Sequence, residues 1–527
     1  MKRILAMMAA AVVPAGLLVG FAGPGQAAQP AEQQPDVVRT DKGLVASRTV
    51  GDALVYDGIP YAAPPVGALR WKAPQPAKAW TGVRPSKAGS VCPQQPNSEA
   101  PKGSSIEDCL YLNVTTPAKK SAKPRAVVVW VPGGGFFSGA GSSYEASKFA
   151  ARGDVVVVTV NYRLGIYGFF GYPGLPGSGT FGLQDQQAAL RWVQHNARAF
   201  GGDPRNVTLA GESAGGMSTC AQLTSPTSTG LFAKAIMQSG SCAFDWLDNS
   251  QYPGQAADSF WIPASRVEAN GKEWADGKKT ELDCKPGQAM LDCLRGAKTE
   301  VLYDDLMAFT QIGYGKSPVV PFSPAKAMRA GLFHRVPMIS GNNHDEANAW
   351  LSAFGEIKDY PGLVKNMVGA SKAARVLKQY PQSRYESPAA AWGAVTTDRI
   401  WSCNQVATDQ QAANKVPVYA YEFADRHSPI SGGMGAAHAA ELPFLFRLGG
   451  FDYPLSPAQQ QLSNQMIDYW TAFARTGNPN GPDRPHWSPT GARTINGLSL
   501  ASTDESGIKP VNLSSEHQCG FWARLGA

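Results

Sequence analysis

The fold is decided at Gly211-Glu212-Ser213-Ala214-Gly215, which reads G-x-S-x-G. An apolar, β-rich run precedes this pentapeptide (206–210), and the residues after it (216–223) can form a helix. A serine on a sharp strand-to-helix turn has a strained backbone, and side chains two positions away would collide with neighbouring elements. Glycines at those positions remove the collision. The pattern therefore predicts a nucleophile elbow, with Ser213 Oγ exposed and the Ala214 amide at a helix N-terminus, where it can stabilise an oxyanion.

A glycine-rich loop follows another predicted strand. The apolar run 127–131 is typical of a buried strand and leads into Pro132-Gly133-Gly134-Gly135-Phe136. Such a loop can point several backbone N–H groups at one place, and a developing alkoxide needs fixed donors of this kind. A phosphate-binding loop would need G-x-x-x-x-G-K-[S/T] instead, and that pattern is absent here. The loop is therefore interpreted as an oxyanion hole.

Composition indicates a globular protein with a large core. The chain has 527 residues, of which 43% are hydrophobic and 17% are charged. Its net charge is +7, and the 48 basic residues are dispersed, so nothing points to a nucleic-acid partner. Neither C-x-x-C nor H-E-x-x-H occurs, so we expect no metal site.

The N-terminus is typical of an exported protein. Residues 1–27 combine Lys2 and Arg3, an apolar stretch and a small-x-small end at Gly25-Gln26-Ala27, which predicts a signal peptide. Residues 28–36 are interpreted as a disordered linker, and residues 37–527 as a single domain. We expect a secreted, extracellular protein without a membrane span in the mature chain. Eight cysteines agree with an oxidising destination, and eight allow 105 pairings: Cys92, Cys109, Cys220, Cys242, Cys284, Cys293, Cys403 and Cys519.

Several separated motifs carry a family resemblance. They are Gly58-Ile-Pro-Tyr-Ala62 with Leu69-Arg70-Trp71, Glu107–Val114, Asn161–Gly165, the G-x-S-x-G pentapeptide, Gly341–Glu346 and Gly435–Leu442. From about Val37 to its end, the chain resembles the type-B carboxylesterases, the carboxylesterase/cholinesterase family, as a secreted bacterial-type member. This resemblance implies the α/β-hydrolase fold: a mostly parallel central sheet, helices on both of its faces, and cap or gorge insertions, here residues 243–325.

The resemblance also assigns the site. It implies a triad of Ser213, Glu346 and His438, in the chain order Ser…Glu…His. The oxyanion donors would be the amides of Gly134, Gly135 and Ala214.

Four further residues bear on this assignment of the site. Asp345 is the nearest rival of Glu346, and the family's usual glycine after the acid is Ala347 here. Ser239 is expected to hydrogen-bond the triad acid, and Glu212 to be a second carboxylate near the site.

Disulfides and ion pairs follow from the same resemblance. It implies the disulfides Cys92–Cys109, Cys284–Cys293 and Cys403–Cys519, whereas the pairing of Cys220 with Cys242 stays open. It also implies two structural ion pairs, Arg70–Glu107 and Arg163–Asp185.

The implied activity is carboxylic-ester hydrolysis through an acyl-enzyme, with a small-molecule ester as substrate and no cofactor. Residues 93–108 contain no tryptophan, which disfavours a cholinesterase. Five aromatic residues could line an apolar pocket: Phe136, Phe137, Trp246, Phe260 and Trp261. Lipase, lactonase, thioesterase, polyester hydrolase and secreted peptidase activities could use the same machinery. A non-catalytic adhesion protein would need a broken triad, and oligomeric state cannot be read from the sequence.

Overall fold

The structure is a computed structural model that describes residues 35–97, 100–282, 284–493 and 495–526. Residues 36–527 form one compact unit. The predicted signal peptide (1–27) and nearly all of the predicted linker (28–36) lie outside the described residues. Asp36 itself is held in place, because its backbone N–H donates to Ser47 Oγ and its carboxylate accepts from Tyr56 OH.

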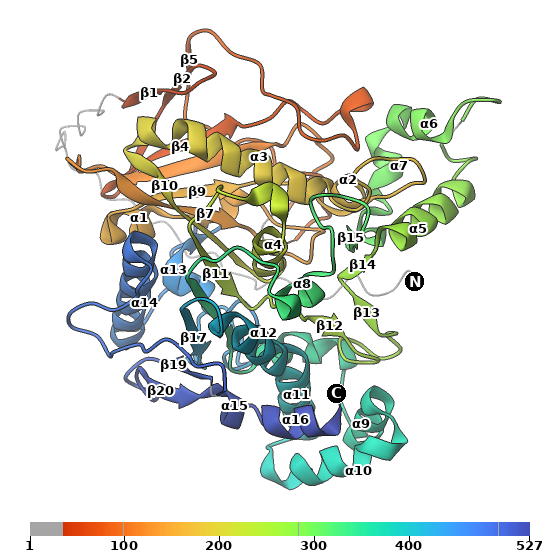
Figure 1. Cartoon of the computed structure of the whole chain (residues 1–527), viewed down its shortest axis with the longest axis vertical. Helices are drawn as coiled ribbons and strands as arrows, with labels where there is room; N and C mark the ends of the chain where they lie inside the picture. The colour runs from red at the N-terminus through yellow and green to blue at the C-terminus, as the bar shows by residue number, and fades with distance from the viewer. Residues whose placement is uncertain (1–34, 98–99, 283, 494, 527) are drawn as a thin grey trace, which may run out of the picture. The chain divides into compact units, whose positions relative to one another are not determined.

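A mixed sheet forms the centre of the fold, as Figure 1 shows, and it has eleven strands among the described residues. In spatial order they are β20 (Lys509–Asn512), β19 (Asn496–Leu500), β17 (Val418–Phe423), β16 (Met338–Asn343), β11 (Lys234–Gln238), β10 (Gly202–Glu212), β7 (Arg125–Val131), β9 (Val156–Val160), β6 (Tyr111–Pro117), β4 (Ala53–Pro60) and β3 (Arg48–Val50). The run from β19 to β9 is parallel, and the strands outside this run are antiparallel. The strands predicted around the site are all in the parallel run.

Alternation along the strands explains why helices cover both faces of the sheet. In β7, Val127, Val129 and Val131 pack in one hydrophobic cluster, whereas Val128 and Trp130 pack in another. The first cluster includes α3 (Phe181–Asn196) and α4 (Ala214–Leu223), and the second includes α1 (Ser147–Gly153) and α14 (Pro457–Thr476). Successive strand residues point to opposite faces, so a fully apolar strand needs cover on both sides.

The remaining elements decorate this core. They are β1 (Val37–Arg39), β2 (Leu44–Ala46), β5 (Val83–Arg84), β8 (Tyr144–Glu145), β12 (Asp245–Trp246), β13 (Asp258–Ser259), β14 (Trp261–Pro263), β15 (Ile312–Tyr314), β18 (Arg447–Leu448), α2 (Gly165–Phe169), α5 (Ala264–Gly277), α6 (Met290–Gly296), α7 (Thr299–Tyr303), α8 (Pro324–Ala330), α9 (Tyr360–Val368), α10 (Ala370–Gln379), α11 (Pro388–Thr396), α12 (Cys403–Ala413), α13 (Leu442–Leu445), α15 (Leu513–Glu516) and α16 (Cys519–Leu525). A π-helix, Thr397–Ser402, joins α11 to α12. The interpreted insertion 243–325 contains β12 to β15 and α5 to α7.

Two local predictions need correction. Alternation over residues 37–56 predicts two or three short antiparallel strands, but the segment forms four strands, because β1 and β2 pair in one small sheet while β3 and β4 join the central sheet. Apolar residues at spacings of three and four predict a helix through Phe200, but this helix is α-helical only to Asn196. Its last turn, Ala197–Phe200, tightens to a 3₁₀ turn that ends at Gly201 with φ 77°.

The eight cysteines form four disulfides: Cys92–Cys109, Cys220–Cys242, Cys284–Cys293 and Cys403–Cys519. Three of these pairs are those that the resemblance implies, and the pair left open is also bonded. Cys220 lies in α4 and Cys242 just after β11, so this bond fixes the helix that begins at the elbow to the neighbouring strand.

Two buried ion pairs brace the scaffold. Arg70 forms a two-point contact with Glu107 and also donates to the backbone carbonyls of Leu294 and Ala297. Arg163 donates two hydrogen bonds of 2.7 Å to the Asp185 carboxylate. Bidentate guanidinium–carboxylate geometry satisfies most of the polar groups of such a pair, which allows its burial.

Candidate active site

The elbow forms as the glycine pattern predicts. Ser213 lies between β10 and α4 with φ 56° and ψ −121°, a strained conformation for a residue with a side chain. A Cβ at Gly215 would lie 2.0 Å from the Val131 carbonyl oxygen, and one at Gly211 would lie 2.5 Å from the Gly215 carbonyl carbon. Only glycine fits at either position. Ala214 is the first residue of α4, so its amide belongs to the N–H groups that have no partner within the helix.

The glycine loop lies directly against this turn. Gly134 and Gly135 have φ values of 90° and 59°, and a Cβ at Gly133 would lie 2.7 Å from Glu212 Oε2. The Gly134 carbonyl accepts from the amides of Phe137 and Ser138, which closes a tight turn. The described residues offer no hydrogen-bond acceptor to the Gly134 and Gly135 amides. These amides are therefore available as donors beside Ser213.

Glu346 and His438 meet across two loops. Glu346 follows β16 and is fully buried, and its Oε2 lies 2.6 Å from His438 Nδ1. Its other oxygen accepts the backbone N–H of Asn343 at 2.8 Å, which fixes the carboxylate. His438 lies in the loop after β17, and 11% of its side chain is exposed. The predicted serine, acid and histidine thus follow three parallel strands at their carboxyl ends, where ligands bind in such sheets.

The rival acid lies elsewhere. Asp345 accepts from the Ala436 backbone N–H, contacts His344 Nδ1 at 2.8 Å and approaches Arg426 Nε at 3.4 Å. Its carboxylate is engaged by these groups rather than by His438. Ala347, which replaces the family's usual glycine, is outside the positive-φ residues and donates its N–H to Thr397 Oγ1, so alanine fits this turn without strain.

Glu212 contacts the histidine directly, which the sequence does not indicate. Its Oε1 lies 3.2 Å from His438 Nε2, so a carboxylate faces each nitrogen of the imidazole. Burial opposes a charge on this ring, but Glu212 and then Glu346 outweigh burial and raise the pKa of His438 to about 9. The site is therefore arranged to stabilise an imidazolium.

A buried polar chain supports the acid from behind. Asn343 donates its side-chain amide to Glu441 Oε2 at 2.8 Å, and Gln238 donates to Glu441 Oε1 at 2.8 Å. Trp470 Nε1 in turn donates to Gln238. Burial raises the pKa of Glu441, and these hydrogen bonds partly offset that effect. The sequence places Glu441 in a matching motif, but it does not reveal this chain.

The role predicted for Ser239 is wrong in its detail. The residue is fully buried and adopts φ 48°, yet its Oγ has no hydrogen-bond partner among the described residues. It therefore does not hydrogen-bond Glu346 in this structure. Residue type alone could not reveal whether this hydroxyl meets the acid.

Aromatic rings surround the histidine. The ring centroids of Trp401 and Trp350 lie 4.6 Å and 5.1 Å from that of His438, and the two indoles stack on each other at 5.4 Å. Phe244 contacts Trp401 at 4.4 Å. None of these three aromatic residues was among the predicted pocket residues, because they come from separate segments of the chain.

Three of the predicted aromatic residues join this series. Trp246 contacts Phe244 at 4.9 Å, and Phe260 bridges Phe244 and Phe136 at 5.9 Å and 5.5 Å. Phe137 packs in a separate cluster around Trp71, and Trp261 packs in the main core.

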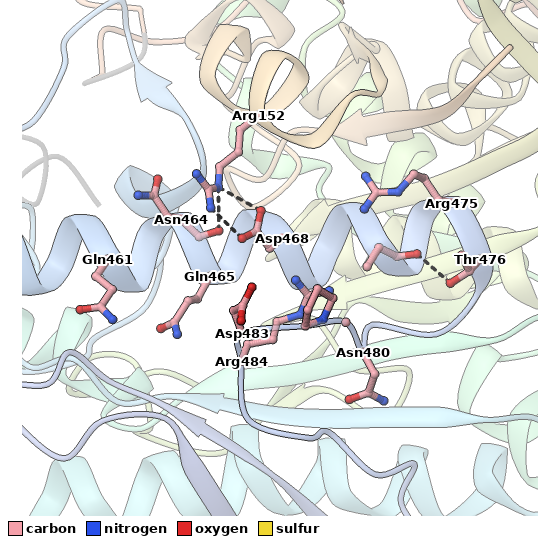
Figure 2. Close-up of a pocket in the computed structure, with 13 residues that line it drawn as sticks. Arg152, Gln461, Asn464, Gln465, Asp468, Arg475, Thr476, Asn480, Asp483 and Arg484 are labelled. Carbon is pink, nitrogen blue, oxygen red and sulfur yellow. Dashed lines mark hydrogen bonds and ion pairs between the residues drawn. The ribbon is translucent and has the colours of Figure 1, made fainter. Parts of the chain in front are cut away.

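A polar surface pocket lies away from the elbow. Figure 2 shows it along α14 and the loop 480–484, with a volume of about 620 Å³. Arg152 donates two hydrogen bonds to Asp468 in it, at 2.9 Å and 2.7 Å, and Arg475 donates to the Gly153 carbonyl. The pocket contains none of the triad residues, and its three arginines are engaged by Asp468 or by backbone carbonyls. The chemistry therefore points to the elbow.

Comparison with known proteins agrees with this geometry. Residues 34–522 match the model of the carboxylesterase family. The chain is 36% identical to the para-nitrobenzyl esterase of Bacillus subtilis (strain 168) over 84% of this chain and 90% of that protein. It is 34% identical to a human cocaine esterase over 82% of this chain and 80% of the relative. A solved PNB esterase superposes with a TM-score of 0.74 and 32% identity, covering 92% of this chain and 99% of that structure.

Fold and site together define an α/β-hydrolase. The chain belongs to the carboxylesterase family, and it is a carboxylic-ester hydrolase. Within the described residues, none of the helices combines the length and the apolar character needed to cross a membrane. The four disulfides are consistent with an extracellular protein.

Proposed function

We propose that the enzyme hydrolyses esters through an acyl-enzyme on Ser213, with His438 as general base and Glu346 as the residue that orients it. The observation that carries this proposal is the 2.6 Å contact of Glu346 with His438 Nδ1, beside a serine on a strained elbow. A buried carboxylate on Nδ1 leaves Nε2 to exchange a proton with the nucleophile.

Catalysis would begin when Ser213 Oγ attacks the ester carbonyl carbon and passes its proton to His438 Nε2. Glu346 would stabilise the resulting imidazolium, and so would Glu212 at 3.2 Å from the ring. The amides of Gly134, Gly135 and Ala214 would hold the oxyanion of the tetrahedral intermediate. Losing one such donor typically costs about 3–4 kcal/mol of barrier.

The proton would then move from His438 to the leaving alcohol, and the C–O bond to the alcohol would break to leave Ser213 acylated. Water would enter, give its proton to His438 and attack the acyl carbon in the same way. Release of the acid would restore the serine hydroxyl. Atoms balance with water as the only co-reactant, and each step uses a group already present at the elbow.

The test is hydrolysis of p-nitrophenyl acetate, butyrate and longer acyl esters by the purified mature enzyme. Ser213→Ala should lower kcat/KM by about 10⁴-fold or more, because the covalent route is lost. Ser121→Ala, an exposed serine in a loop, is the matched control and should leave the rate unchanged. Equal rates in the parent and in Ser213→Ala would exclude this mechanism. Faster cleavage of p-nitroanilides than of the esters would point to a peptidase.

We also propose that the enzyme is exported and acts outside the cell. Support comes from residues 1–27, which read as a signal peptide, and from four disulfides that need an oxidising compartment. N-terminal sequencing of protein recovered from the culture medium should begin at Ala28. Enzyme found only inside the cell, with the first 27 residues intact, would contradict export.

A further inference from the structure

A second polar cavity lies away from the elbow, between α12, the strands β16 and β17, and α15. Its volume is about 10 Å³, which is room for one water-sized particle. It is lined by Asn342, Ser402, Gln405, Val406, Asp409, Tyr421, Glu422, Leu513 and His517. All of these residues are buried, so the cavity is part of the protein interior.

Four oxygen atoms in this lining lack a hydrogen-bond partner among the described residues. They are Ser402 Oγ, Gln405 Oε1, Asp409 Oδ2 and Tyr421 OH, and we call them the oxygen cluster. Buried polar atoms are normally paired, because leaving one unpaired costs its full desolvation. Four such atoms on residues that line one small cavity leave hydrogen-bonding capacity there for a bound particle.

Charge around the cavity is negative. His517 lies between Asp398 and Glu422, at 2.7 Å from each, so one imidazolium faces two carboxylates. Asp409 adds another carboxyl group, and among the described residues no ion pair includes it. Burial raises the pKa of Asp409 to about 7, and hydrogen bonds from Ser340 and Gln405 oppose that rise.

The chemistry of the oxygen ligands limits which ion can occupy the cavity. The oxygen cluster contains one carboxylate and three neutral oxygens, and it offers no nitrogen or sulfur. Hard cations prefer oxygen ligands, and divalent cations usually take several carboxylates. The described residues hold no group of three or more acidic, histidine or cysteine side chains that could bind a metal. A small cation with a single charge therefore fits the cavity best.

We propose that this cavity is a sodium-binding site whose ligands are the oxygen cluster. The ion would join α12, through Asp409 and Gln405, to β17, through Tyr421. Gln405 also donates to Ser340 of β16, the strand that leads to Glu346. Sodium would therefore stabilise the scaffold beneath the triad acid and take no part in the ester chemistry.

Thermal unfolding of the full mature enzyme at pH 8 tests this site. The unfolding midpoint is measured in sodium chloride and in choline chloride at equal ionic strength, because choline is too large for the cavity. A site filled to about 100 times its dissociation constant should raise the midpoint by about 2–3 °C in a chain of this length. Esterase activity at 25 °C should be the same in both salts within about two-fold.

Variants show whether a sodium-dependent shift of the unfolding midpoint comes from this site or from a general effect of salt. Asp409→Asn should abolish the sodium-specific shift, and Ser402→Ala should weaken it while keeping the charge. Asp504→Asn removes an exposed carboxylate and should keep the full shift. Equal midpoints in sodium and choline for the parent would overturn the proposal, as would an equal sodium shift in Asp409→Asn.

A high-resolution crystal structure at pH 8 in sodium chloride gives a second, independent readout. A cation of this size should lie about 2.4 Å from its oxygen ligands, whereas a water would lie about 2.8 Å away. Density at the water distance would overturn the proposal and assign a protonated Asp409 with one bound water.

Discussion

His438 and His517 each lie between two carboxylates, and of these two rings only His438 is at the elbow. His438 contacts Glu346 and Glu212, whereas His517 contacts Asp398 and Glu422. Burial opposes the charge in both, but the carboxylates prevail and raise the pKa of His438 to about 9 and that of His517 to about 10. A strongly shifted histidine pKa is therefore not by itself evidence of catalysis.

The two histidines differ in the contact that Nε2 of each ring makes. Both nitrogens of His517 have hydrogen-bond geometry to a carboxylate, at 2.7 Å each. In His438 only Nδ1 has this geometry, whereas Nε2 is held by a 3.2 Å ion pair to the residue next to Ser213. Both nitrogens of His517 are thus occupied by hydrogen bonds, whereas Nε2 of His438 makes only the longer contact with Glu212. The general-base role proposed for His438 depends on this weaker contact at Nε2.

The largest expected effect comes from replacing each histidine in turn. His438→Gln should lower kcat/KM by about 10⁴-fold or more, because the general base is lost. His517→Gln should keep activity within about ten-fold at 25 °C, because that ring touches no reacting group. Ester hydrolysis at substrate concentrations well below KM measures both. If folded His517→Gln lost as much kcat/KM as His438→Gln, the proposed difference in role between the two histidines would be wrong.

The second prediction compares two neighbouring carboxylates, Glu346 and Asp345, of which only Glu346 contacts Nδ1 of His438. Glu346→Gln should reduce kcat by about 10⁴-fold, because an amide cannot stabilise the imidazolium and favours the wrong tautomer. Asp345→Asn is the matched control on the neighbouring residue and should reduce kcat by less than about ten-fold. Steady-state kinetics on one p-nitrophenyl ester measures both, and a reversed order of the two variants would return the acid role to Asp345.

Sequence reasoning succeeded where constraints are local. The elbow could be predicted because Gly211 and Gly215 each leave no space for a Cβ, and that requirement is written in five consecutive residues. His438 and Glu346 were located through motifs next to their strands. The buried strand β7 was also predicted, because residues 127–131 are a short, fully apolar run.

Sequence reasoning failed where partners are distant. Asp398 and Glu422 lie 119 and 95 residues from His517, so no local pattern marks that ion pair. Trp401 contacts His438 from a π-helix, an element that no sequence pattern indicated. Ser239 was assigned a hydrogen bond from its position alone, but its Oγ has no partner among the described residues.

Stability should depend on pH through His517. Its pKa is raised from 6.5 to about 10 on folding, so the folded state binds this proton more tightly than the unfolded state. The resulting stabilisation is complete below about pH 6.5 and is lost as the pH rises through about 10. The difference in unfolding free energy between the parent and His517→Gln should therefore shrink over that range, as denaturant titrations can measure. A difference that grows with pH would contradict the charged assignment.

The smallest expected effect concerns Glu212. Glu212→Gln removes the carboxylate charge that contributes most to the raised pKa of His438, so the neutral, active ring should persist to lower pH. The acid limb of the kcat/KM profile should move to lower pH by about one unit or more. An acid limb that stays in place, or that moves to higher pH, would show that Glu212 does not set the charge of this histidine.

Covalent trapping tests the central claim, that Ser213 is the nucleophile, most directly. The enzyme is inactivated with diethyl p-nitrophenyl phosphate, and the labelled residue is located by mass spectrometry of its peptides. The account predicts one diethylphosphoryl group per chain, on Ser213, appearing in step with the loss of esterase activity and absent from Ser213→Ala. Complete inactivation with the label on another residue, or with no label on the peptide that contains Ser213, would contradict it.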